Sequence, residues 1–225
     1  SQNINHLNLI KSRVFSLGQQ LIKDSAVIQA IYGDEELTPI EQAALSRKLY
    51  NVIDSDSIIH SIFLYNAKTK EINDTFENES SDSLTATMLN LLINFNEDNK
   101  YQFIPNRVSY KKVNGEIKYD NVVSAVIWDS GYFVGDLSDM KSDEPKIGAI
   151  IINLRADAIQ SSIAASPQDQ SAETMILDKN GTIIFDSNLE SFSRNIEGDK
   201  DYLLEIINSS EVEGTVRKKS MERNP

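Results

Sequence analysis

Six residues in the middle of the chain could together form a binding site for a small molecule. Arg107 stands at the start of an expected strand, where its planar guanidinium could hold a carboxylate through two hydrogen bonds. Trp128 and Asp129 end another expected strand and Tyr132 follows them, so the three could enclose a cavity and orient an amine. The weaker members of this expected site are Tyr101 and Tyr110.

Two of these assignments have a structural alternative that the sequence leaves open. Arg107 lies in a chain with surplus acids, where an arginine is commonly part of a surface ion pair. Trp128 is the only tryptophan, and it could equally be core packing with its N–H satisfied locally. Under these alternatives neither Arg107 nor Trp128 would contact a ligand.

The sequence holds no residue set for catalysis or metal binding. It has no cysteine and two histidines, His6 and His60, and His60 is expected to be a structural residue on a strand face with Ile62 and Leu64. The acids between residues 136 and 144 lack the spacing of a calcium loop, and no nucleophile elbow or phosphate loop occurs. We therefore expect no enzyme, no catalytic residue, no metal and no cofactor.

Charge and composition narrow the range of partners. The formal net charge is -12, from 34 acidic and 22 basic residues, which opposes binding to nucleic acid or to an anionic lipid surface. Hydrophobic residues make up 40% and charged residues 25%, as in ordinary globular domains. No apolar stretch is long enough to span a membrane, and both ends have the character of cuts in a longer protein.

The first element that must position these residues is a long helix. Apolar residues from Leu7 to Ile31 recur at steps of three and four, with Asp24 as the one polar member. This spacing predicts a helix from near the start of the chain to about Tyr32, where Gly33 provides a stop. Its apolar stripe either packs within the chain or forms the seam of a homodimer.

Two further helices are expected before the strands that carry the candidate site. Thr38, Pro39 and Glu41 have the pattern of a capped helix start, and that helix should end near Asp54. A third helix is expected over residues 84–95, after a polar loop at 73–83. The second helix should bury the residues Ile40, Ala44, Leu45, Leu49 and Val52.

Apolar runs and Asn-Gly turns predict the strands. A strand at 58–65 with a weak returning partner comes first, and residues 107–113 and 117–119 then flank Asn114-Gly115. Residues 121–128 and 148–154 are buried-strand patterns on either side of a long acidic loop at 129–145. A helix at 155–163 leads to a second hairpin, 174–177 and 182–186, and a short helix and a strand are expected at 202–207 and 214–216.

The long helix and the segments IIHSIFLYN (58–66), GAIIINLRADAI (148–159) and ILDKNGTIIFD (176–186) resemble the double Cache (PAS-like) extracellular sensor family. The resemblance covers residues up to about 208 and implies an α+β fold. It implies a signalling helix at 1–35, a membrane-distal PAS-like module with an antiparallel sheet at 36–165, and an incomplete membrane-proximal one at 166–225. Arg107 is followed by Val108-Ser109, which departs from the Arg-x-Trp-Tyr run of the family's amino-acid sensors.

The resemblance also implies a function. Such domains lie on the extracellular face of a bacterial cell membrane and are held there by flanking segments. They bind a small molecule in the distal module and pass a conformational change through the long helix to a histidine kinase or an AraC-type regulator. The alternative is a non-sensing extracellular scaffold that assembles through the helix seam.

Overall fold

The computed structural model describes residues 2–74, 81–93, 95, 100–113, 116–129, 147–164, 175–177 and 183–186. The chain divides into two compact units, Ser1–Ala172 and Glu173–Pro225. The second unit contains an antiparallel hairpin of β6 (Met175–Leu177) and β7 (Ile183–Asp186), which confirms the hairpin expected there. The Asn-Gly turn between these strands and the elements expected at 202–207 and 214–216 lie outside the described residues.

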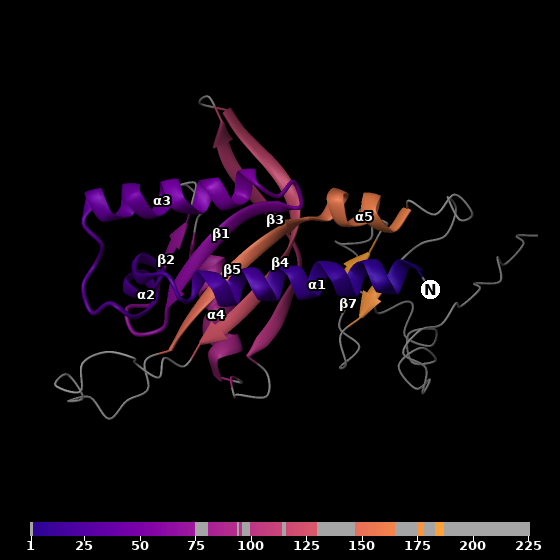
Figure 1. Ribbon diagram of the computed structural model, residues 1–225. Coiled ribbons are helices and arrows are strands. Elements are labelled where there is room, and N and C mark those ends of the chain that lie inside the picture. The colour runs from indigo at the N-terminus through magenta and orange to yellow at the C-terminus, as the bar shows by residue number, and fades with distance from the viewer. Residues whose placement is uncertain are drawn as a thin grey trace, which may run out of the picture. The chain divides into compact units, whose positions relative to one another are not determined.

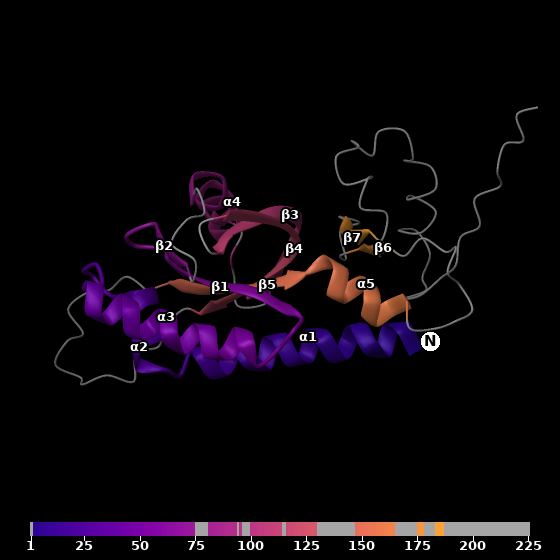
Figure 2. The same cartoon turned by 90° about the horizontal axis from the view of Figure 1, so that it is seen from above.

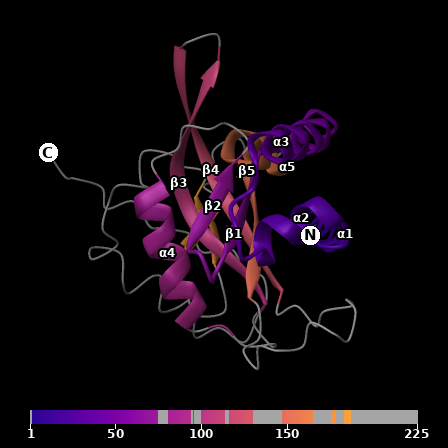
Figure 3. The ribbon, with the colours of Figure 1, turned by 90° about the vertical axis from the view of Figure 1, so that its left-hand side faces the viewer.

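The first unit is a five-stranded antiparallel sheet with helices on both faces, as the expected α+β class requires (Figures 1 and 2). Its strand order is β2-β1-β5-β4-β3. The views from above and from the end place α1, α2 and α3 on one face and α4 on the other (Figures 2 and 3). The elements are α1 (Gln2–Leu21), α2 (Ser25–Tyr32), α3 (Pro39–Asp54), β1 (Ile59–Asn66), β2 (Glu71–Asp74), α4 (Ser81–Ile93), β3 (Tyr101–Val113), β4 (Glu116–Asp129), β5 (Gly148–Arg155) and α5 (Ala156–Ala164).

The centre of the sheet is buried on both faces. All eight residues of β1 are buried, as are the first seven of the eight in β5, which confirms the strand pattern expected for residues 148–154. Successive side chains of a strand point to opposite faces. Phe63 and Tyr65 therefore belong to the α4 face, and Ile62 and Leu64 face the layer of α1, α2 and α3.

The expectation of one unbroken helix to Tyr32 is wrong, because Asp24 divides it. The backbone of Asp24 is extended, and its carboxylate accepts a hydrogen bond from the backbone N–H of Ala26 at 3.0 Å. Asp24 is thus the N-cap of α2, and its carboxylate also pairs with Lys48 of α3. The one polar member of the apolar stripe is the residue at which the helix is interrupted, while Gly33 ends α2 as expected.

The expected capping box of α3 is confirmed, but its expected buried face is only partly right. The backbone N–H of Thr38 donates to the carboxylate of Glu41 at 2.8 Å, and the hydroxyl of Thr38 accepts from the N–H of Glu41 at 3.4 Å. Leu45 and Leu49, one turn apart, are buried. Ile40 is 83% exposed, because the first turn of α3 does not contribute to the packed face. Of the other two expected core residues, Ala44 is exposed and Val52 is half-buried.

β3 starts earlier than the sequence pattern indicates. The strand begins at Tyr101, not at Arg107, and runs through Pro105. Its pairing with β4 is irregular between Ile104 and Arg107. Proline has no N–H to give to the ladder, and β3 is an edge strand, where such an interruption is tolerated.

Two glycines bring the helical layer into direct contact with the sheet. A Cβ added to Gly148 of β5 would lie 2.7 Å from the Cβ of Ile31 and 2.8 Å from its carbonyl oxygen. A Cβ added to Gly18 of α1 would lie 2.9 Å from Cδ1 of Ile127 on β4. The first contact is with backbone and the second with the end of a side chain, so the two positions differ in what must move.

We predict that Gly148→Ala lowers the free energy of unfolding by about 1–3 kcal/mol, because the backbone of α2 must shift to admit the methyl group. Gly18→Ala should lower it by less than about 1 kcal/mol, because Ile127 can rotate and alanine gains about 1 kcal/mol of helix propensity. Urea denaturation of both variants measures the difference. Equal losses would contradict the assigned contacts.

A second prediction concerns the cap between α1 and α2. The hydrogen bond from Lys48 holds the pKa of Asp24 below its ordinary value of 3.8. The ionised carboxylate therefore stabilises the fold fully above pH 3.8. This stabilisation is lost as the pH falls through the lower pKa that Asp24 has in the folded chain. Asp24→Ala, which loses cap and ion pair, should lower the free energy of unfolding at pH 7 by about 1–2 kcal/mol. Asp24→Asn keeps the cap, so its free energy of unfolding should fall by less than about 1 kcal/mol. Urea denaturation measures both variants. A larger loss in Asp24→Asn than in Asp24→Ala would refute the role of Asp24 as a cap.

Candidate functional site

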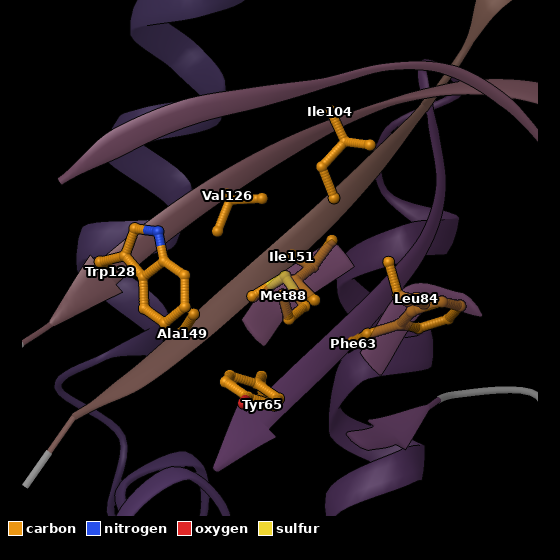
Figure 4. Packing of buried hydrophobic residues seen from close by; sticks show 9 residues of the cluster. All are labelled: Phe63, Tyr65, Leu84, Met88, Ile104, Val126, Trp128, Ala149 and Ile151. Atoms are coloured by element: carbon orange, nitrogen blue, oxygen red, sulfur yellow. The ribbon is translucent and has the colours of Figure 1, made fainter. Parts of the chain in front are cut away.

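The face of the sheet under α4 carries a continuous group of buried apolar side chains, which we call the α4-face cluster (Figure 4). It draws residues from α4 and from four strands that are distant in sequence. Phe95 also packs against it. The members of the α4-face cluster are Phe63, Tyr65, Leu84, Met88, Ile104, Val126, Trp128, Ala149 and Ile151.

Tyr65 is the polar exception in the cluster. Its side chain is 0% exposed, and among the described residues no group accepts or donates a hydrogen bond at its hydroxyl. Burial raises the pKa of Tyr65, so the hydroxyl stays protonated at neutral pH and remains a donor. A buried donor without a partner costs about 1–3 kcal/mol, so an acceptor bound at this hydroxyl would recover that free energy.

Trp128 lies between two other aromatic rings of this face. Its ring is 5.9 Å from that of Tyr65 in an edge-on arrangement and 5.6 Å from that of Phe95. Its indole N–H donates to the side-chain oxygen of Gln102 at 3.0 Å. Trp128 is therefore packed against the Tyr65 ring, with its own N–H satisfied locally.

The sheet separates Trp128 from two of the residues expected to join it. Asp129 is the next residue along β4, and its carboxylate accepts a hydrogen bond from the hydroxyl of Tyr32 on α2. Tyr101 faces α1, with its ring 4.5 Å from that of Phe15. Asp129 and Tyr101 thus attach the helical layer to the sheet, on the face opposite to the α4-face cluster.

The other three expected site residues are only partly placed. Arg107 and Tyr110 lie on β3, paired with Val122 and Tyr119 of β4, and their side chains are not described. Tyr132 lies outside the described residues. The assignment of these residues to a ligand site stays a prediction.

A buried polar group that the sequence reasoning missed crosses three strands. Ser61 of β1, Asn153 of β5 and Ser124 of β4 are cross-strand partners and are all fully buried. His60 and Asp120 extend the group on the same face. The available signal was polar residues inside three apolar runs, the pair His60-Ser61 in the first and Ser124 and Asn153 in the other two. We call these five residues the polar relay: Ser124, Asn153, Ser61, His60 and Asp120.

A β-bulge corrects the expected position of His60. The pairing of β1 with β5 shifts between Ile59 and Ser61, so His60 is the extra residue. Its ring contacts Ser61 and Asp120 and does not share a face with Ile62 and Leu64. Ser61, His60 and Asp120 have the residue types of a hydrolytic triad, but the Ser61 hydroxyl is fully buried and cannot meet a substrate.

The described residues offer neither a metal site nor a membrane-spanning helix. Among them, no three His, Cys, Asp or Glu side chains gather in a way that could hold a metal ion. Within the same residues, no helix combines the length and apolar character needed to cross a membrane.

Comparison with solved structures places the fold. The chain resembles the crystal structure of an extracellular domain from a protein described as histidine kinase vpHK1S-Z8, at a TM-score of 0.51 and 11% identity over 89% of this chain and 70% of that one. It also matches a domain described as belonging to a sensory box/GGDEF family protein from Vibrio parahaemolyticus, at a TM-score of 0.42 and 12% identity, covering 81% and 66% of the two chains. No protein-family model and no curated protein matches the sequence.

The chain thus shares its fold with that extracellular domain, a mixed arrangement of helices and antiparallel sheet that is compatible with a PAS-like fold. This likeness concerns the fold alone. The chemistry of the site has to come from the residues described above.

We predict that two tyrosine variants have opposite effects on stability. Tyr65→Phe removes a buried donor that has no partner among the described residues, so the free energy of unfolding should rise by about 1 kcal/mol. Tyr32→Phe removes a hydrogen bond to a carboxylate and should lower it by about 1–2 kcal/mol. Urea denaturation without added ligand measures both, and a clear loss of stability in Tyr65→Phe would show that its hydroxyl has a partner in the fold.

Proposed function

We propose that the chain is the extracellular ligand-sensing domain of a bacterial transmembrane signal-transduction receptor. The observation that carries the proposal is the Tyr65 hydroxyl, a buried hydrogen-bond donor inside an aromatic cluster. The fold supports it, because an extracellular domain described as part of a histidine kinase shares that fold. The membrane segments and a kinase or AraC-type output domain belong to parts of the receptor beyond these residues.

The ligand is a small, mostly apolar molecule with one hydrogen-bond acceptor. It binds on the α4 face, with its acceptor on the Tyr65 hydroxyl and its apolar part against Trp128 and Phe95. Arg107 on β3 remains a candidate for a carboxylate of the ligand. Asp129 and Tyr101 have a different role in this proposal, because they lie on the helical face.

Binding biases the arrangement of the helices through the sheet. β5 touches α2 where Gly148 meets Ile31, and β4 is tied to α2 by the hydrogen bond between Asp129 and Tyr32. A ligand that favours one arrangement of β4 and β5 therefore favours one position of α2. The shift cannot exceed the difference between the affinities of the ligand for the two states.

One observation favours the second candidate function, a scaffold domain that assembles as a homodimer through α1. Leu9 of α1 is a large apolar side chain that is 66% exposed, so it could contact a second copy of the chain, whereas Val14 and Leu21 of the apolar stripe are buried within one chain. Such a domain would respond to its own concentration and not to a small molecule.

A thermal-shift screen with amino acids, short carboxylic acids and aromatic amines separates the two functions. A ligand of the native state raises the melting temperature by mass action, whereas a dimer melts higher only as protein concentration rises. We predict that a hit shifts the wild type and Tyr101→Phe equally, and that Tyr65→Phe and Trp128→Ala abolish the shift.

Arg107→Ala should weaken only those hits that carry a carboxylate. A hit that shifts all four variants as it shifts the wild type would remove the assigned site. The scaffold would be favoured by a melting temperature that rises with protein concentration and does not respond to any compound. In Leu9→Ser this dependence on concentration should disappear.

A further inference from the structure

The polar relay is a continuous series of four side-chain hydrogen bonds across the middle of the sheet. Nε2 of His60 lies 3.1 Å from a carboxylate oxygen of Asp120, and Nδ1 lies 2.9 Å from the hydroxyl of Ser61. The amide of Asn153 donates to that hydroxyl oxygen at 2.8 Å and accepts from the hydroxyl of Ser124 at 2.6 Å. His60, Ser61, Ser124 and Asn153 are all 0% exposed, whereas the Asp120 side chain is 38% exposed.

The hydrogen bonds of the relay run in one direction when His60 is neutral. The carboxylate of Asp120 can only accept, so Nε2 carries the proton and Nδ1 is the acceptor. The Ser61 hydroxyl then donates to Nδ1, and its oxygen accepts from Asn153, which in turn accepts from Ser124. Every donor of the relay points toward Asp120.

Protonation of His60 reverses the direction of the inner bonds. A proton on Nδ1 makes the ring a donor to Ser61, so the Ser61 hydroxyl must turn away from the ring. The acceptor nearest along the relay is Asn153, whose amide oxygen meets that hydroxyl once its side chain rotates by half a turn. The amide nitrogen then donates to Ser124. In this direction the Ser124 hydroxyl must turn its own proton to an acceptor outside the relay. The relay therefore has two states that differ by one proton.

Charged residues on the neighbouring strands act in opposite directions on the protonation of His60. Asp120, in contact with Nε2, favours the protonated ring, whereas Arg155 lies two residues after Asn153 on the same face of β5 and opposes it. The other charged residues on the elements next to this part of β1 are Lys118 on β4, Arg107 on β3, Asp82 on α4, Asp157 on α5, and Asp54 and Asp56 at the end of α3.

We propose that the polar relay is a proton-sensing switch, in which protonation of His60 reverses the hydrogen bonds of Ser61, Asn153 and Ser124. The switch joins β1, β5 and β4, the three central strands of the sheet. It lies at the bulge of β1, where the ladder is already interrupted. The proton is an input separate from the ligand of the proposed function, so the domain would report acidity even where no small molecule binds.

Nuclear magnetic resonance of the 225-residue chain between pH 8 and pH 5 tests the switch. The chain has one other histidine, His6, which is exposed, so the signals of only two rings have to be assigned. We expect the His60 ring to convert from the Nε2–H tautomer to the protonated form in this range. We also expect the side-chain amide signals of Asn153 to move with the same midpoint as His60.

Two controls identify the reversal. Asn66 is a buried asparagine outside the relay, bonded to Gly33, Lys68 and Thr69, and its amide signals should not follow His60. Ser61→Ala removes the link between the ring and Asn153, so His60 should still titrate while Asn153 becomes independent of pH.

The proposal is overturned if His60 stays neutral until the chain unfolds, or if it titrates while Asn153 does not change in the wild type. The wild-type titration decides between these outcomes even if Ser61→Ala does not fold. This titration does not measure ligand binding, so failure of the switch leaves the proposed sensing function unaffected.

Discussion

Alternation of side chains across a sheet that is covered on both faces is the constraint on which the rest of the structure depends. Each residue of β4 and β5 faces either α4 or the layer of α1, α2 and α3, and neighbours in sequence cannot serve the same face. Trp128 therefore joins the aromatic cluster while Asp129 holds α2. The sheet thus separates the aromatic cluster, where we propose that a ligand binds, from the hydrogen bond that attaches α2.

The parts of the fold that could be predicted are those set by neighbouring residues. The capping box of Thr38 and Glu41, the doubly buried strand at 148–155 and the second hairpin all depend on contacts within a few positions. The break at Asp24 could not be predicted in this way. A polar residue in an apolar stripe either lies within a continuous helix or caps a new one. The partner of Asp24 that accompanies the cap, Lys48, lies 24 residues further along the chain.

The candidate site was harder to predict, because its geometry depends on which strands pair. Trp128 could be recognised from its type, and alternation alone separates it from Asp129. Tyr65 gave no signal, since a tyrosine in a strand is ordinary until burial leaves its hydroxyl without a partner among the described residues. His60 was placed on the wrong face because the bulge exists only in the pairing with β5.

The carboxylate of Asp24 has a consequence for how movements travel through the helical layer. It caps the start of α2 and pairs with the middle of α3, so two helices share one side chain. Under the proposed function, a displacement of α2 would be transferred to α3 through this ion pair, and it would reach α1 only across the short turn before Asp24. Because α1 and α2 are separate helices, the angle between them is the quantity that such a displacement would change.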